Sequence, residues 1–147
     1  MLSSVCIGTD DLSAATAFYD PVLATIGLTR IINGDHEVGY APEGLPDASP
    51  HVWVVRPYDG QAARAGNGVQ FLFAADGADA VDAFHAAILT QGGTDEGAPG
   101  PRDYMPGYYG AYGRDAVGNK LHAFCIVAAA ASEGTAALGK GPEREAP

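Results

Sequence analysis

Apolar residues follow two spacings along the chain, first as short runs and then at helical intervals, and this order occurs twice. The runs at 2–8 and 69–75 are typical of β-strands. Each run is followed by a stretch whose apolar residues share one face of a helix, at 14–26 and 78–91, and then by a glycine. The pattern therefore predicts a strand and then a helix at the start of each half.

Particular residues mark the ends of the first helix. Asp11 and Ser13 are both candidate N-caps, because their side-chain oxygens can accept from free amides of the first turn. Pro21 lies inside the helix and lacks an amide donor, so we expect a kink or an early end near Asp20. Gly27 is the expected helix stop.

More strands are predicted after each helix. Three follow the first helix, at 28–33, 36–40 and 51–57, and two follow the second, at 108–114 and 119–127. Gly34-Asp35 is a hairpin signal between the first two. The segment 94–107 is rich in glycine and proline and is expected to be a long irregular loop.

An offset of 66 residues superimposes the two halves. At this offset Ala17-Phe18 falls on Ala83-Phe84, Leu23 on Leu89, and Gly27 on Gly93. The expected fold is therefore α+β, with two βαβββ modules that form a curved mixed sheet, or half-barrel, around a cavity. The modules pair either within one chain or by exchange between two chains.

The predicted domain covers residues 1–127. Its modules are 1–57 and 68–127, joined by a polar linker at 58–67, and an alanine-rich tail follows at 128–147. Part of this tail is a candidate helix.

Charge and hydropathy limit the expected partners. Eight basic residues against eighteen acidic ones give a formal net charge of −10, and no Lys/Arg cluster suggests a nucleic-acid partner. The apolar runs are shorter than the ~20 residues that span a bilayer, and no secretory signal is visible, so we expect a cytoplasmic protein without a membrane partner. Cys6 and Cys125 lie in apolar runs and are expected to be buried, reduced thiols.

Three segments resemble the vicinal oxygen chelate superfamily, which includes glyoxalases, extradiol dioxygenases, fosfomycin-modifying enzymes and bleomycin-binding proteins. Residues 108–123, YYGAYGRDAVGNKLHA, resemble its last hairpin, and residues 17–23, AFYDPVL, resemble its first helix. Residues 92–100, GGTDEGAPG, are similar to the second-half loop of its small bacterial glyoxalase-like members. The resemblance implies the glyoxalase-like fold and a small-molecule pocket.

The resemblance also implies where a metal ion would bind. Metal-dependent members place His or Glu on the first and last strands of each half, and the matching positions here are Ser4, Trp53, Gln70 and His122. Only His122 is an ordinary ligand for a divalent metal, whereas a catalytic site needs about three protein ligands. We therefore expect no metal cofactor.

The resemblance supplies Ser4, Trp53 and Gln70 as candidate site residues, and strand alternation adds His51, Tyr108 and Tyr112. The expected ligand-binding residues are Ser4, His51, Trp53, Gln70, Tyr108 and Tyr112. His122 is the candidate catalytic residue, as a general acid or base, with a hydrogen-bonded core histidine as the alternative. His36 and His85 are expected to be solvated or rim histidines.

The sequence thus favours a metal-independent, glyoxalase-like protein that binds a small organic molecule, flat or cationic, and forms a homodimer. One alternative is a metal-dependent lyase, isomerase or dioxygenase. Its ligands besides His122 would come from His51, from a carboxylate of the 94–103 loop (Asp95, Glu96 or Asp103) or from a second chain. Another is a drug- or metabolite-sequestering protein without turnover.

Overall fold

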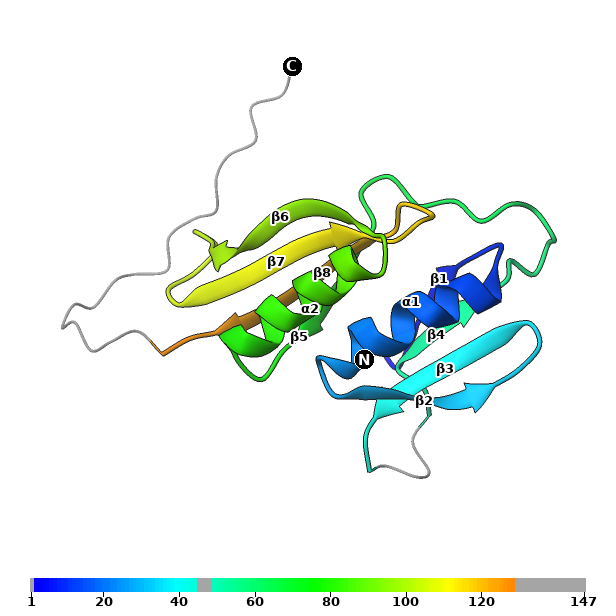
Figure 1. The fold of residues 1–147 in the computed structure, drawn as a ribbon, viewed down its shortest axis with the longest axis horizontal. Helices are drawn as coiled ribbons and strands as arrows, with labels where there is room; N and C mark the ends of the chain where they lie inside the picture. Colours follow the sequence, from blue (N-terminus) through cyan, green and yellow to red (C-terminus); the bar gives the residue numbers. More distant parts are fainter. Residues whose placement is uncertain (1, 45–48, 129–147) are drawn as a thin grey trace, which may run out of the picture.

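Two copies of one βαβββ unit form the described part of the chain (Figure 1), and the predicted fold class is confirmed. The computed structural model describes residues 2–44 and 49–128. The first unit contains β1 (Val5–Gly8), α1 (Leu12–Ala24), β2 (Leu28–Asn33), β3 (Glu37–Pro42) and β4 (Val52–Val55). The second contains β5 (Gln70–Ala74), α2 (Ala78–Thr90), β6 (Thr94–Pro101), β7 (Tyr108–Arg114) and β8 (Lys120–Ile126). Nearly all of the predicted tail, including its candidate helix, lies outside the described residues.

Each unit has its own four-stranded mixed sheet. The strand orders are β1-β4-β3-β2 and β5-β8-β7-β6, and neither sheet closes into a barrel. In each sheet the first and last strands of the unit pair in parallel, with Val5 opposite Val52 and Leu72 opposite His122. Because β1 and β5 lie at the ends of these orders, each has one edge to which no described strand is paired.

One face of each sheet is covered by the helix of its own unit, and the two helices also contact each other. In the second unit Val81, Phe84 and Ile88 of α2 are fully buried, as are Leu121 and Ala123 of β8. A fully buried side chain of this size contributes about 1.5–3 kcal/mol to folding. No described helix packs on the opposite face of each sheet, and we call it the open face.

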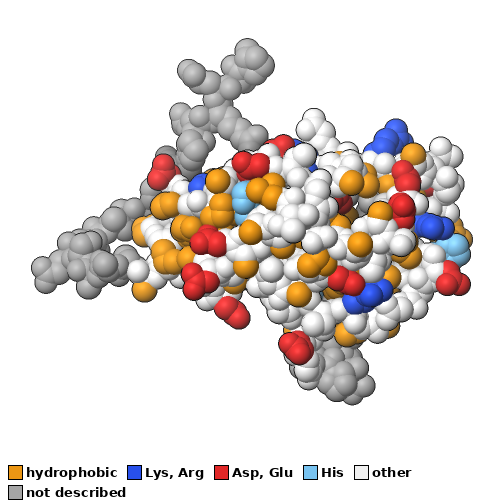
Figure 2. Space-filling model, viewed as in Figure 1, with side chains coloured by type: hydrophobic (Ala, Val, Ile, Leu, Met, Phe, Trp, Pro, Cys, Tyr) orange, Lys and Arg blue, Asp and Glu red, His pale blue; other side chains and the backbone are white. Residues whose placement is uncertain are grey.

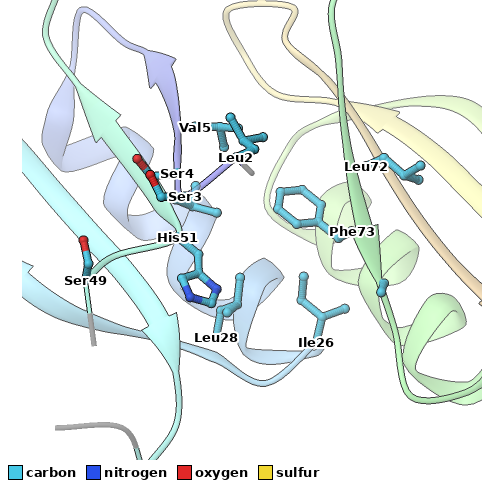
Figure 3. Close-up of a pocket in the computed structure, with 12 residues that line it drawn as sticks. Leu2, Ser3, Ser4, Val5, Ile26, Leu28, Ser49, His51, Leu72 and Phe73 are labelled. Carbon is cyan, nitrogen blue, oxygen red and sulfur yellow. The ribbon is translucent and has the colours of Figure 1, made fainter. Parts of the chain in front are cut away.

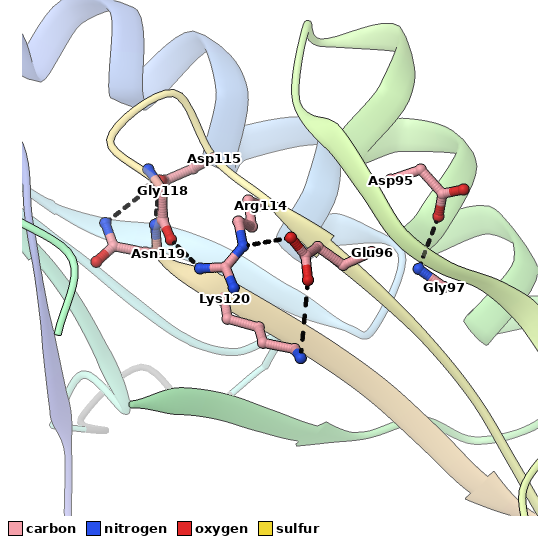
Figure 4. A network of polar contacts seen from close by, with 8 residues as sticks. All are labelled: Asp95, Glu96, Gly97, Arg114, Asp115, Gly118, Asn119 and Lys120. Atoms are coloured by element: carbon pink, nitrogen blue, oxygen red, sulfur yellow. Dashed lines mark hydrogen bonds and ion pairs between the residues drawn. The ribbon is translucent and has the colours of Figure 1, made fainter. Parts of the chain in front are cut away.

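A buried hydrogen-bond network joins the units. Tyr19 of α1 donates to Asp115 Oδ2 at 2.6 Å, and Asn119 Nδ2 donates to the same oxygen at 2.8 Å. Asp115 Oδ1 accepts from the backbone amides of the turn between β7 and β8, including that of Gly118 (Figure 4). Tyr19 thus ties the first helix to the last hairpin.

The loop predicted over 94–107 is wrong in its first half, because Thr94–Pro101 forms strand β6. This strand pairs antiparallel with β7, with register shifts between Asp95 and Gly97 and between Gly97 and Gly100. Proline is tolerated because β6 is an edge strand, where one side of the backbone needs no partner. Pairing with β7 therefore overrides a composition that disfavours strands.

Of the kink or early end predicted near Asp20, the early end does not occur, because α1 continues through Pro21 to Ala24. Val22 and Leu23, which follow the proline, are fully buried. Their burial compensates for the one backbone hydrogen bond that Pro21 cannot make. Asp11 is the N-cap, and its carboxylate accepts from the Ala14 amide at 2.9 Å.

Cys6 is exposed, contrary to its predicted burial, whereas Cys125 is buried. Ile7, the next residue of β1, lies in the core, so Cys6 lies on the open face. No helix among the described residues is both long enough and apolar enough to cross a membrane. Acidic side chains are spread over the surface seen in Figure 2, in line with the charge of −10.

Candidate functional site

The predicted site residues lie in different parts of the structure. Ser4 and His51 line a pocket between the two units, and that pocket is not lined by Trp53, Gln70 or His122. Trp53 lies on the open face of the first sheet, half-buried beside Gly39 and opposite Cys6. The remaining four residues, Gln70, Tyr108, Tyr112 and His122, form one cluster on the open face of the second sheet.

The pocket between the units encloses about 650 Å³ (Figure 3). Its wall is mainly apolar, with Phe73 of β5 facing Ile26 and Leu28 of the first unit. Its polar side chains are those of Ser3, Ser4, Ser49 and His51. Leu72 also lines this pocket and lies opposite His122 in the sheet, so the pocket borders the cluster around His122.

Aromatic rings surround His122 on the open face of the second sheet. The centroid of the Tyr112 ring lies 4.0 Å from that of His122, and the Tyr108 ring stacks on Phe124 at 4.9 Å. Gly110, between the two tyrosines, makes room for the imidazole, because a Cβ atom there would lie 2.7 Å from His122 Nε2. The predicted alternation along β7 is therefore observed, with Tyr109 on the helix side, where it donates to Asp82 of α2 at 2.8 Å.

Both ring nitrogens of His122 have partners within the chain. Gln70 Nε2 donates to Nδ1 at 3.1 Å, which places the ring proton on Nε2. Nε2 then faces the Tyr108 hydroxyl oxygen at 3.3 Å and donates to it. Burial, followed by the positive charges of Arg102 and Lys120, lowers the pKa of His122 from 6.5 to about 4. His122, 2% exposed, is therefore neutral at pH 7.

Basic side chains flank the same cluster. The Arg102 guanidinium carbon lies 5.4 Å from the centroid of the Tyr112 ring, and Lys120 Nζ lies 5.1 Å from it. Glu96 of β6 is bound to Arg114 at 2.7 Å and lies 3.9 Å from Lys120 (Figure 4). Two of the eight basic residues of the chain thus lie over one tyrosine ring, and a third, Arg114, is paired with Glu96 beside Lys120.

These donors do not fit a divalent metal ion. Across residues 2–44 and 49–128, no three His, Cys, Asp or Glu side chains are grouped so that they could hold one. Nδ1 of His122 already accepts from Gln70, so the imidazole has no free lone pair to offer. Glu96, considered above as a further ligand, is paired with Arg114.

Several contributors to this cluster were not among the predicted site residues. Arg102, Tyr104 and Lys120 lie on or beside it, and Glu96, named only as an alternative metal ligand, pairs with Arg114 there. Lys120 could be placed from the sequence, because it lies two residues before His122 on the same strand. Arg102 could not, because it follows β6, and the glycine- and proline-rich composition of β6 did not indicate a strand.

The prediction of a solvated His85 is wrong, although His36 is exposed as expected. His85 of α2 is 7% exposed, and its Nε2 lies 2.9 Å from Asp95 Oδ1. Strand β6 places Asp95 beside His85. The burial of His85 was therefore missed for the same reason as β6, because residues 94–101 were predicted to be a loop.

Comparison with solved structures finds glyoxalase-related proteins. A glyoxalase/bleomycin resistance protein from Albidiferax ferrireducens T118 is 37% identical, with a TM-score of 0.72, and the match covers 84% of this chain and 96% of that protein. A glyoxalase/bleomycin resistance protein/dioxygenase family enzyme from Burkholderia phytofirmans PsJN is 23% identical, with a TM-score of 0.64 and coverage of 86% and 98%.

The fosfomycin resistance protein FosX from Mesorhizobium loti is 17% identical, with a TM-score of 0.58 and coverage of 87% and 93%. The two matches below 25% identity show a shared fold. No protein-family model matches the sequence, and no curated protein matches it.

Proposed function

Because this chain belongs to the glyoxalase/bleomycin resistance protein family, we propose that it binds a small organic molecule on the open face of its second sheet without a divalent metal. The observation that carries the proposal is the state of His122. Its two ring nitrogens are engaged by Gln70 and Tyr108, so neither is free to bind a metal ion. A metal ion bound here would have to break the bond from Gln70 and approach a site flanked by two cations.

The same contacts define the role of His122 in this proposal. A general base needs a free lone pair directed at the substrate, and Nδ1 is directed at Gln70. Nε2–H donates to the Tyr108 oxygen, so the hydroxyl proton of Tyr108 is free to point at a ligand. We therefore assign His122 to positioning Tyr108, and the site to binding rather than proton transfer.

A second copy of the chain completes the site in this proposal. The open face carries exposed apolar side chains at its border, with Leu72 at 49% and Ile126 at 52%. They lie next to β5, whose outer edge has no paired strand among the described residues. Covering this face with a partner would bury these side chains and turn an open surface into a cup.

The metal content of the purified protein tests the proposal directly. Protein prepared without chelators is expected to contain far less than one Zn, Ni, Mn or Fe per chain by plasma mass spectrometry, before and after dialysis against each metal. About one tightly bound ion per chain would contradict it and would favour the metal-dependent lyase, isomerase or dioxygenase. Binding of 2-naphthol, a flat neutral compound, measured by calorimetry, tests whether the face takes an organic ring.

A further inference from the structure

The local charge around Tyr112 is opposite in sign to that of the whole chain. The chain carries a formal charge of −10, which by itself favours a cationic ligand. The open face of the second sheet instead presents Arg102, Arg114 and Lys120 against one carboxylate, that of Glu96. The face of the Tyr112 ring would attract a cationic ligand, but Arg102 and Lys120 already lie over it and would repel that ligand.

Arg102 has donors to spare. It gives one hydrogen bond to the Pro101 carbonyl at 3.0 Å and one to the Ala98 carbonyl at 2.7 Å. A guanidinium has five N–H groups, so three remain. Among the described residues Arg102 makes no ion pair with a carboxylate, and these carbonyl bonds hold its side chain in place over Tyr112.

Hydroxyl donors lie beside the cations. Burial raises the pKa of Tyr108 above its usual value, so its hydroxyl stays protonated at neutral pH. Tyr112 donates to the Tyr104 hydroxyl at 3.1 Å, and Tyr104 is 65% exposed, which leaves the Tyr104 proton available to a ligand. The Tyr108 and Tyr112 rings are only 7% and 9% exposed, so a ligand first meets the exposed Tyr104 hydroxyl and the half-buried Arg102 and Lys120, with the aromatic rings beneath them.

We propose that this site selects flat organic anions, aromatic carboxylates in particular, with the carboxylate held by Arg102 and Lys120 and the ring lying against the aromatic cluster. The inference rests on the proposed function, since it specifies the ligand of the same face. Charge-assisted hydrogen bonds from a guanidinium to a carboxylate are short, directional and stronger than neutral ones. Arg102 supplies the fork, and Lys120 supplies a point charge.

Three naphthalene compounds that differ in charge test the inference. Calorimetry is performed on the full chain with 2-naphthoate, 2-naphthol and 2-naphthyltrimethylammonium. The naphthoate is expected to bind at least about tenfold more tightly than 2-naphthol, and the cation more weakly than 2-naphthol. The preference for the naphthoate is expected to fall as salt is added.

Two substitutions locate the effect. Arg102→Gln and Lys120→Gln are each expected to weaken naphthoate binding by about tenfold while leaving 2-naphthol binding within about twofold. Arg64→Gln, which removes the same charge from an exposed linker position, is the matched control and is expected to change neither. Because Arg102 also binds two carbonyls of β6, Lys120→Gln provides a variant that leaves those bonds intact.

The outcomes distinguish a failure of the charge selection from a failure of the proposed ligand binding. If all three compounds bind equally, or if both substitutions leave naphthoate affinity unchanged, the charge selection is wrong and ligand binding stands. Tighter binding of the cation would also overturn the selection. If none of the compounds binds, the proposed function and the inference fall together.

Discussion

At the scale of single residues, His122 is held neutral by its surroundings. Its ring is 2% exposed, both nitrogens have partners, and two cations lie nearby. Protonation would place a third positive charge beside Arg102 and Lys120 and would break the bond that Nδ1 accepts from Gln70. The native state therefore resists protonation of this side chain, whereas the unfolded chain does not.

This resistance predicts a pH-dependent stability. The pKa of His122 is about 4 in the folded protein and about 6.5 when unfolded, so the unfolded chain binds more protons between these values. The stabilisation is present above pH 6.5 and is lost as the pH falls towards 4. The free energy of unfolding is expected to decrease by up to about 3 kcal/mol from this residue alone.

Urea unfolding of the His122→Gln variant at pH 7 and pH 4.5 measures this contribution. The variant is expected to lose less stability on acidification than the unsubstituted protein, because its side chain does not titrate. His36→Gln, at an exposed hairpin position, is the control and should retain the full dependence. Equal pH dependence of His122→Gln and the unsubstituted protein would show that His122 is not the source.

At the scale of elements, β6 is held by side chains that compensate for a composition poor in strand formers. Asp95 accepts from His85 of α2 at 2.9 Å and from the Gly97 amide at 2.8 Å (Figure 4). The His85 hydrogen bond, followed by that of Gly97, lowers the pKa of Asp95. One carboxylate thus links the strand to the helix and supports the register shift next to it.

The Asp95→Ala variant is expected to loosen β6 locally. Amide hydrogen exchange in β6, at Gly97 above all, should become several-fold faster, while exchange in β8 should change little. In the unsubstituted protein the amides of β6 should lose their protection from exchange only at acidic pH. There the pH falls below the lowered pKa of Asp95 and its carboxylate becomes protonated. Glu43→Ala, at an exposed position, is the control. Unchanged exchange in β6 would contradict the linking role of Asp95.

At the scale of the whole molecule, the two units meet through α1 and α2, and their sheets remain separate. Ser4 and Trp53 are therefore not brought to Gln70 and His122, although all four are matching positions of the repeat. The open face of each sheet is left uncovered, and Leu72 lies at the border of the second. This arrangement motivates the proposed dimer.

Substitution at Leu72 tests that dimer. We expect the unsubstituted protein to be dimeric by light scattering at micromolar concentrations and Leu72→Glu to be largely monomeric, because the substitution would place a carboxylate in an apolar contact. Leu89→Glu, on the surface of α2 with a similar exposure of 43%, is the matched control and should stay dimeric. A monomeric unsubstituted protein would rule out completion of the site by a second copy.

The sequence by itself was sufficient for the βαβββ order of the first half, for the elements of the second half other than β6, and for the faces of most strands. Periodicity carries this information, because each strand and helix must turn its apolar side to the core. It placed Tyr108, Tyr112 and His122 on one face, as the structure has them. It failed at β6, because an edge strand is defined by its neighbour β7 and not by its own residues.

Only the tertiary structure decided which side chains meet. The contacts of His85 with Asp95 and of Arg102 with Tyr112 both depend on where β6 runs, and the exposure of Cys6 depends on which face no helix covers. The local positive charge at Tyr112 is likewise invisible in a composition with an excess of acids. Charges act over a few ångströms in space, whereas periodicity and composition record only order and number along the chain.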